Sequence, residues 1–464
     1  MRDLLIDIDP AAARGRQGAI ERALREGVRS GRLAPGSRLP STRSLAAELG
    51  VARSTVVLAY EQLVAEGYLN SRHGAGTVVA NVPRPAAEPT DAAARSGGPD
   101  LDLVPGEPDP TLFPRARWAA ATRRALDTAG DDLFGYGDRR GRPELRRALS
   151  TYLGRTRAVV APPERVVVLG GMTAAFALLA EALRGLGVER LAVEDPCLPP
   201  LARAFSAAGL TVVPVPVDED GLSVAVLRGA AAGAVLVTPA HQYPLGPTMS
   251  PARRADLVDW AIDSGGWIIE DDYDGEFRYD RRPIGAVQGL APERVVYAGT
   301  ASKAMAAGLR LGWLVVPPDL APALDRAVGR RAGVSAVEQA TLAGFLETGD
   351  YDRQVRRARA VYRQRRDRLV EALTDAAPHL VLSGVAAGLH LTARTTDGPS
   401  ESAMVQAAHA RGLALLGLSG HYTGGPAAEG IVLGFSRMPE HRFATALDRL
   451  LAVVAPERPD RPAQ

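Results

Sequence analysis

This chain contains a single lysine. Lys303 is the only lysine among 464 residues, and arginine supplies every other one of the 55 Lys and Arg residues. Arginine can replace a surface lysine without loss of charge, but it cannot lose its proton and attack a carbonyl group as an amine can. The alternative is that one lysine survived by chance at a neutral position. The composition therefore predicts that position 303 requires a nucleophilic or imine-forming nitrogen, and burial would lower the pKa of such an amine.

The neighbours of this lysine are suited to a phosphorylated ligand that bears an aldehyde. The run 294–298 predicts a short buried strand. Thr300 and Ser302 then place hydroxyl groups at the carboxyl end of that strand, where open α/β sheets bind their ligands. Arg310 follows closely and can hold a phosphate through its guanidinium group. The segment as a whole predicts a site for such a ligand.

A group of acids follows the apolar run 267–270. Residues 270–274 read Glu-Asp-Asp-Tyr-Asp and begin at the expected carboxyl end of a strand. A carboxylate there can keep a pyridine nitrogen protonated, which makes such a ring an electron sink. A solvated acidic loop is the alternative. The position of these acids upstream of Lys303 favours the ligand site.

Two more segments can contribute to the same site. Gly170-Gly171-Met172-Thr173 predicts a helix N-terminus, whose free amides are suited to a phosphate. The segment 238–246, Thr-Pro-Ala-His-Gln-Tyr-Pro-Leu-Gly, predicts a strand followed by a turn. For His241 within it, a ligand contact and a structural role in the turn both stay open.

These segments belong to an alternation of strands and helices that starts near residue 101. Short apolar runs predict strands, with helical stretches between several of them, at 166–169, 190–193, 212–215, 234–238, 267–270 and 295–298. This order predicts an α/β fold with a doubly wound sheet. Beyond residue 320 the pattern is richer in helix, and the runs 389–392 and 431–435 predict a smaller α+β subdomain.

Length and composition set further bounds. The length of 464 residues predicts two or more domains. The net charge of +2 predicts no overall attraction to nucleic acid. Cys197 is the only cysteine, which excludes an intramolecular disulfide and indicates a reducing compartment. No apolar run is long enough for a membrane helix, and residues 1–7 lack the layout of a signal peptide. We therefore expect a cytoplasmic protein with no membrane partner, and we predict no metal site.

Residues 12–82 predict a separate unit made of three helices and two strands. The helices are expected at 17–30, at 44–49 and at 53–66, with Ser41 as the N-cap candidate of the second helix and Gly50 ending it. The strands are expected at 68–69 and 77–79. This order is that of a winged helix-turn-helix, with a small helical accessory domain as the alternative. Residues 83–100, rich in Pro, Ala, Gly, Ser and Thr, predict a linker to the large domain at 101–464.

Six basic, hydroxyl or imidazole side chains cluster on the expected DNA-docking elements of this first unit, with no acid among them. The candidate DNA-binding residues are Arg43, Arg53, Ser54 and Thr55 on the helices, and Arg72 and His73 on the wing.

Several motifs resemble known families. Residues 31–46 (GRLAPGSRLPSTRSLA), the helix that starts at Arg53 and the Gly-x-Gly-Thr wing at 74–77 resemble the GntR-type repressors. The Thr300-Ala301-Ser302-Lys303 run with Arg310 resembles the lysine and arginine motif of fold type I enzymes of the aspartate aminotransferase group, which use pyridoxal 5'-phosphate (PLP). The segment 238–246 resembles a hallmark of the MocR/GabR subfamily of GntR regulators. The resemblance covers nearly the whole chain, and it implies a winged helix-turn-helix joined to a PLP-dependent transferase-like domain.

The resemblance also implies roles for individual residues. Lys303 would bind the aldehyde of PLP, Asp271 the ring nitrogen, Tyr273 the ring hydroxyl and Arg310 the phosphate. The other residues placed at the cofactor are Thr300, Ser302, Gln242, Tyr243, Met172 and Thr173, and Tyr136 would reach the phosphate of the partner subunit in a homodimer.

Two positions depart from the family pattern. Leu198 stands where an aromatic residue would stack on the cofactor ring, and Val432 where an arginine would grip a substrate carboxylate. Unless Arg437 or Arg115 reaches into the site, a simple α-amino acid would lack its usual partner. We therefore expect the small-molecule effector to be PLP itself, so that the protein senses vitamin B6 supply; an amine or unusual amino acid is the alternative.

The predicted function is that of a PLP-dependent transcriptional regulator. Its first unit would bind double-stranded operator DNA, and its second would sense the effector. An active aminotransferase with an appended DNA-binding domain is one alternative. A scaffold whose cofactor site has decayed is another, and the retained lysine argues against it.

Overall fold

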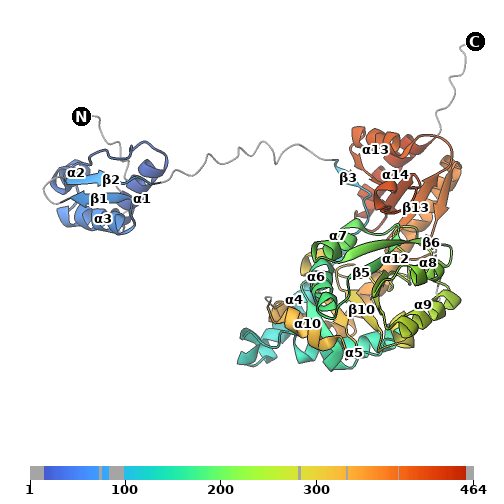
Figure 1. Cartoon of the computed structure of the whole chain (residues 1–464). Coiled ribbons are helices and arrows are strands. Elements are labelled where there is room, and N and C mark those ends of the chain that lie inside the picture. The colour runs from blue at the N-terminus through green and yellow to red at the C-terminus, as the bar shows by residue number, and fades with distance from the viewer. Residues whose placement is uncertain are drawn as a thin grey trace, which may run out of the picture. The chain divides into compact units, whose positions relative to one another are not determined.

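The computed structural model describes residues 15–72, 76–82, 99–280, 284–330, 333–384 and 386–455. Residue contacts separate two compact units, which divide between Gly97 and Gly98. Figure 1 shows the elements of each unit. The predicted wing residue His73 lies outside the described residues, and the side chain of Arg72 is likewise not described.

The first unit has the predicted order of three helices followed by a hairpin. Its elements are α1 (Arg16–Arg29), α2 (Thr42–Leu49), α3 (Arg53–Ala65), β1 (Leu69–Arg72) and β2 (Gly76–Val79). The Ser41 side chain accepts the Ser44 N–H at 3.1 Å, and Gly50 ends α2 in the left-handed region at φ +62°. Leu69 pairs with Val79 in an antiparallel hairpin. The unit closes around Ile20, Leu24, Leu45, Val56, Leu63 and their neighbours.

The second unit is organised around an eight-stranded sheet. In spatial order its strands are β4 (Val166–Leu169), β11 (Gly312–Val315), β10 (Val295–Thr300), β9 (Trp267–Asp271), β8 (Ala234–Val237), β5 (Arg190–Asp195), β6 (Thr211–Asp218) and β7 (Gly221–Leu222). The central strands from β10 to β6 run parallel, whereas β11 is antiparallel to both neighbours. All six predicted strands are present; β7 and β11 were not predicted.

Helices cover both faces of this sheet. On one face lie α6 (Met172–Gly185), α7 (Pro199–Ala207) and α10 (Ala321–Val328), and on the other α8 (Val224–Gly229) and α9 (Pro251–Ser264). Alternate residues of one strand enter different cores: Val296 and Ala298 pack with α6, and Val295 faces α9. Burial on both faces explains the continuous apolar runs in the sequence. The predicted doubly wound α/β fold is confirmed.

The remaining helices connect the sheet to a smaller subdomain. They are α4 (Arg115–Thr128), α5 (Pro143–Arg157), α11 (Ala336–Glu347) and the long α12 (Asp350–Ala376). The subdomain contains β12 (Leu380–Ser383), β13 (His390–Thr395), β15 (Leu416–Gly417), β16 (Gly430–Gly434), α13 (Glu401–Ala410) and α14 (Glu440–Val454); Figure 1 shows α13 and α14 together at one end of the unit. The predicted α+β subdomain is thereby confirmed.

The start of the second unit also belongs to this subdomain. There β3 (Leu101–Asp102) pairs in parallel with β14 (Leu413–Ala414), so segments more than 300 residues apart lie side by side. Among the described helices, none combines the length and apolarity needed to cross a membrane.

Candidate functional site

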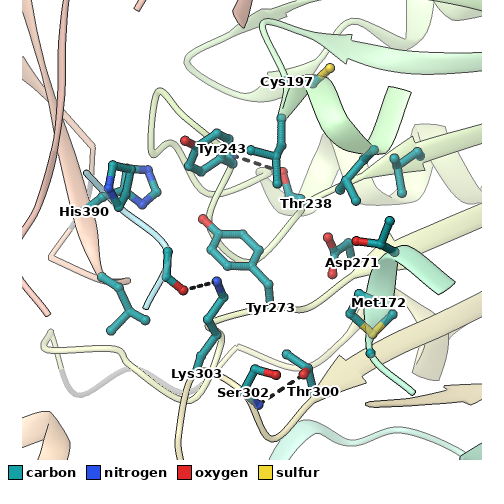
Figure 2. Close-up of a pocket in the computed structure, with 18 of the residues that line it drawn as sticks. Met172, Cys197, Thr238, Tyr243, Asp271, Tyr273, Thr300, Ser302, Lys303 and His390 are labelled. Atoms are coloured by element: carbon teal, nitrogen blue, oxygen red, sulfur yellow. Dashed lines mark hydrogen bonds between the residues drawn. The ribbon is translucent and has the colours of Figure 1, made fainter. Parts of the chain in front are cut away.

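A cavity of about 270 Å³ lies at the carboxyl ends of the central strands. Of the eleven residues predicted to bind the cofactor, its wall contains nine: Met172, Thr173, Tyr243, Asp271, Tyr273, Thr300, Ser302, Lys303 and Arg310. Figure 2 shows Lys303, Tyr273 and Asp271 converging on this hollow; Asp271 ends β9, and Tyr273 and Lys303 come from the segments that follow β9 and β10. Its size is near the lower end of small-molecule sites.

Lys303 has the electrostatic setting that an amine nucleophile needs. Burial lowers the pKa of Lys303, while the nearby carboxylates of Asp274, Asp271 and Glu107 oppose that shift. The amine donates a hydrogen bond to the backbone carbonyl of Gly106 (Figure 2). A lowered pKa increases the fraction of neutral amine, which is the form that attacks a carbonyl carbon.

The acids that surround Asp271 are each committed to a partner within the protein. Glu270 accepts the N–H groups of Val287 and Gln288 at 3.0 and 2.9 Å. Asp272 forms a two-fold hydrogen-bonded ion pair with buried Arg157 at 2.6 and 2.9 Å. These carboxylates therefore have structural roles.

Asp271 differs from these neighbours. Its Oδ1 atom is buried and has no hydrogen-bond partner, and the residue faces the cavity. Burial raises the pKa of Asp271 to about 7 even though Lys303 acts in the opposite direction. An unpaired buried oxygen is costly, so the site is complete only when a ligand offers this atom a donor. A protonated ring nitrogen is such a donor, and the residues present are thus compatible with PLP.

The other end of the cavity is built for an anion. Helix α6 starts after Gly171, and the first-turn amides of Met172 and Thr173 have no partner within the helix. A Cβ atom at Gly171, whose φ is +95°, would lie 3.2 Å from the Arg310 Cζ atom, so the absent side chain lets the guanidinium approach the helix. Thr300 supports the adjacent turn by accepting the Ser302 N–H at 3.1 Å. Helix amides and a guanidinium together match a phosphate.

The cavity also has a wall of neutral aromatic and imidazole groups. The Tyr273 hydroxyl donates to the His241 carbonyl at 3.1 Å, and the Tyr243 hydroxyl lies 3.2 Å from His421 Nε2. His390 Nε2 lies 3.1 Å from the Pro244 carbonyl, and burial lowers the pKa of His390, which keeps this imidazole neutral. This wall offers no charge to a ligand carboxylate.

His241 has a structural role in the turn. It is 3% exposed, and its Nδ1 atom lies 2.9 Å from Asp274 Oδ2. His241, Asp274 and His390 place potential ligand atoms within 4.8 Å of one another. The hydrogen bonds of His241 to Asp274 and of His390 to the Pro244 carbonyl account for the burial of this cluster without a metal ion.

Two predicted cofactor residues are outside the cavity wall. Gln242 lies behind it: its amide nitrogen donates to the carbonyls of Pro196 and Tyr243 at 2.8 and 2.7 Å, and its oxygen accepts the Leu245 N–H at 3.1 Å. These backbone groups occupy the Gln242 side chain, and its placement near the cofactor ring stays a prediction. Tyr136 is fully exposed in the connection before α5, away from the cavity of its own chain.

The two departures from the family pattern have clear positions. Leu198 lines the cavity, whereas Val432 is buried within β16 opposite Thr392 and outside the cavity wall. Arg437 forms ion pairs with Asp102 and Glu107 instead of entering the site. In the wall formed by the described residues, Arg310 is the sole arginine, and Arg115 is absent from it.

Other residues of the site had no individual role predicted from the sequence. The Thr238 hydroxyl donates to buried Glu194 at 2.5 Å, and both residues line the cavity. Their positions after β8 and at the end of β5 follow the rule that ligands bind at carboxyl ends of strands, which could have indicated them. Gly106 and His390 come from distant segments, and no local pattern indicates them.

In the first unit the predicted DNA-binding side chains are accessible. Arg43, Arg53 and Ser54 are exposed and Thr55 is half-buried. Arg53 Nε lies 3.4 Å from Thr42 Oγ1, which brings the starts of α2 and α3 together. Neither helix has an acid in its first turn, so nothing there opposes a phosphate.

Comparison with protein families divides the chain in the same way. Residues 16–79 match the bacterial regulatory proteins of the gntR family, and residues 102–408 match aminotransferase class I and II. The archaeal alanine:glyoxylate aminotransferase superposes with a TM-score of 0.71 at 25% identity, over 78% of this chain and 92% of its own. Thermus thermophilus LysN, an alpha-aminoadipate aminotransferase complexed with N-(5'-phosphopyridoxyl)-L-leucine, superposes with a TM-score of 0.69 at 22% identity, over 76% and 92%.

Similar proteins exist over nearly the full length. The probable rhizopine catabolism regulatory protein MocR of Rhizobium meliloti is 34% identical over 456 residues, 93% of this chain and 92% of its own. The pyridoxine biosynthesis transcriptional regulator PdxR of Corynebacterium glutamicum is 34% identical over 461 residues, 98% and 99% of the two chains.

Proposed function

The chain belongs to the MocR family of GntR-type transcriptional regulators, in which a helix-turn-helix unit is joined to an aminotransferase-like domain, and from this premise we propose that it is a PLP-responsive regulator. Its winged helix would bind operator DNA, and its cavity would bind PLP as cofactor and signal. The observation on which the proposal depends is the meeting of the lone lysine and an unpaired buried carboxylate in one cavity. Action on chromosomal DNA requires a cytoplasmic location.

Specific residues would hold the cofactor. Lys303 would bind the aldehyde carbon, Asp271 would accept a hydrogen bond from the ring nitrogen, and Arg310 with the first turn of α6 would bind the phosphate. When bound, PLP supplies an electron sink. Burial lowers the pKa of the Lys303 amine and so favours its neutral form, and apolar residues such as Leu198 and Leu201 line the same cavity.

PLP is also the effector that the cavity favours. A carboxylate-bearing amino acid would need an arginine beyond the one at the phosphate end, and the described cavity wall offers neutral His, Tyr and Leu side chains instead. PLP does not need this additional arginine. The relative PdxR, which matches 98% of the chain, is named as a regulator of pyridoxine biosynthesis. Its likeness supports vitamin B6 supply as the signal.

A catalytically active aminotransferase is the second candidate. The lowered pKa of Lys303 and the presence of Asp271 favour it, because both suit turnover as well as binding. Among the described residues that line the cavity, no arginine beyond Arg310 is present to bind a carboxylate, which argues against efficient transamination of common amino acids. Steady-state assays with a panel of amino donors distinguish the two, since a regulator should show negligible turnover with all of them.

The direct test is a titration of DNA binding. Purified cofactor-free protein is mixed with fluorescent operator DNA. One set of samples then receives PLP alone, and separate samples receive amino compounds. We expect PLP alone to change operator affinity and Lys303→Arg to remove that response. The proposal is wrong if PLP leaves affinity unchanged while a standard amino acid shifts it strongly.

A further inference from the structure

A second hollow of about 730 Å³ shares no wall residue with the cofactor cavity. It lies between the C-terminal end of α5, the segment 275–279 and the first half of α12. The guanidinium groups that line it belong to Arg155, Arg157, Arg278, Arg356, Arg359 and Arg363, against the two acids Glu276 and Asp352. The proposed function uses none of these groups.

Three of the six arginines already form close ion pairs with aspartates. Arg157 is paired with Asp272 inside the protein, and Arg278 is paired with Asp280 at 2.6 Å. Arg155 pairs with Asp352 at 2.7 Å, but its side chain is 56% exposed, so solvent weakens that pair. Water and a new anion can therefore compete for Arg155.

The other three arginines form a row along α12. Arg356, Arg359 and Arg363 are spaced by three and four residues, which places them on one face of the helix over about 10 Å. Arg359 is held by the Glu276 carbonyl at 3.1 Å, which fixes its direction without neutralising its charge. Arg363 approaches Asp367 only to 3.7 Å, and Arg356 makes no ion pair with any described residue.

Glu276 does little to offset this positive charge. It accepts hydrogen bonds from Tyr152 and Tyr351 at 2.8 and 3.1 Å, and burial raises the pKa of Glu276 to about 7. Its carboxyl group is therefore partly protonated near neutral pH. Asp352 remains as the acid that faces the row, and Arg155 already engages it.

We propose that this arginine groove, defined by Arg155, Arg356, Arg359 and Arg363, binds the phosphate backbone of duplex DNA that flanks the operator. The inference rests on the proposed function, because the winged helix would bring DNA to the same chain and raise its effective concentration at the groove. A row of fixed guanidinium groups matches the closely spaced charges of a DNA strand. A lone phosphorylated metabolite would leave part of that row unused.

The test compares two double variants of the full-length, PLP-bound protein. Arg356→Ala/Arg363→Ala removes two charges from the groove. Arg123→Ala/Arg357→Ala is the matched control, since both control residues are exposed arginines outside the groove and Arg357 lies on the same helix. Each protein is titrated with an operator trimmed to the winged-helix half-sites and with the same operator extended on both sides, between 50 and 200 mM salt.

For the extended operator we expect the groove variant to bind more weakly at low salt. The magnitude of its slope of log K against log salt should be smaller than that of the wild type by about 1.8, roughly 0.9 for each lost phosphate contact. Between 50 and 200 mM salt, the fold-loss of affinity of the groove variant should therefore be roughly tenfold smaller than that of the wild type. The control variant should match the wild type. On the trimmed operator all three proteins should bind alike, and unchanged visible absorbance confirms an intact cofactor site.

Other outcomes separate the possible failures. Equal slopes for groove variant and control on the extended operator overturn the groove proposal. Binding of inorganic phosphate that the groove variant loses, with DNA binding unaffected, identifies a small-anion site and also overturns it. Failure of the wild type to bind the trimmed operator refutes the proposed function of the winged helix, a result independent of any difference between the two variants.

Discussion

Replacing Asp271 by asparagine should stabilise the cofactor-free protein and weaken PLP binding. The carboxyl group is buried with one unpaired oxygen, and its pKa is raised to about 7 from an ordinary value near 3.9. The folded state therefore holds this proton more tightly than the unfolded state. Stability from this group is complete below about pH 4 and is lost as the pH rises towards 7.

The size of the effect follows from the shift. About three pKa units correspond to about 4 kcal/mol of penalty at pH 8, which a neutral asparagine avoids. Lys303 would lose one of the carboxylates that favour its charged form, which offsets part of the gain. We expect the Asp271→Asn protein without PLP to be about 2 kcal/mol more stable than wild type at pH 8 and little changed at pH 4.

The effect on PLP binding has the opposite sign. Loss of a charge-assisted hydrogen bond costs about 1.5–3 kcal/mol, so Kd should rise about 10- to 100-fold. At a concentration 100 times the wild-type Kd, PLP stabilises the wild type by about 2.7 kcal/mol, and the variant should gain only about 0.4–1.4 kcal/mol.

Denaturant unfolding of the second unit at pH 4 and pH 8, with and without PLP, measures these quantities. The neighbouring Asp272→Asn is the control. It leaves buried Arg157 without its partner and should destabilise the protein by about 3 kcal/mol with or without PLP. If Asp271→Asn destabilises the cofactor-free protein at pH 8 as Asp272→Asn does, the inference of an unpaired carboxylate is wrong.

Three further predictions concern other parts of the chain. Lys303→Arg should abolish both the visible absorbance of added PLP and borohydride labelling, because arginine cannot form the bond; a retained band would exclude Lys303. Arg53→Ala should weaken operator binding by about 1–3 kcal/mol without altering the circular dichroism of the first unit, and unchanged affinity would contradict the docking of α3. The protein should sediment as a homodimer, and the Tyr136→Phe variant should bind PLP about tenfold more weakly than the wild type. A PLP-saturated monomer at micromolar concentration would refute this arrangement.

The sequence predicted those parts of the site that local patterns determine. A strand followed by polar residues places those residues at a sheet edge, and Asp271, Thr300 and Lys303 do line one cavity at that edge. Turn and cap signals located Ser41 and Gly50 in the same way. The family resemblance then supplied the cofactor, which the residues alone limited to a phosphorylated aldehyde.

What the sequence could not predict depends on partners that are distant along the chain. Asp271 and Asp272 are adjacent and chemically identical, yet only Asp272 meets Arg157, which lies 115 positions away. A motif also does not fix the direction of each side chain, and Gln242 turns to backbone carbonyls instead of the cavity. The antiparallel β11 was missed because its four residues follow β10 without an intervening α-helix.

The unpaired carboxylate connects the cofactor site with sensing. A ligand shifts an equilibrium only by the difference in its free energy of interaction with the two states. Asp271 destabilises the empty site at neutral pH, and PLP would remove that cost when it offers a donor to the Oδ1 atom. An amino acid that enters afterwards would face the neutral side chains of Tyr243 and His390. Its carboxylate would gain no comparable free energy of interaction from them. Under the proposed function, the arrival of PLP would therefore be the largest free-energy change available to this cavity, which is the property required of a sensor of the cofactor.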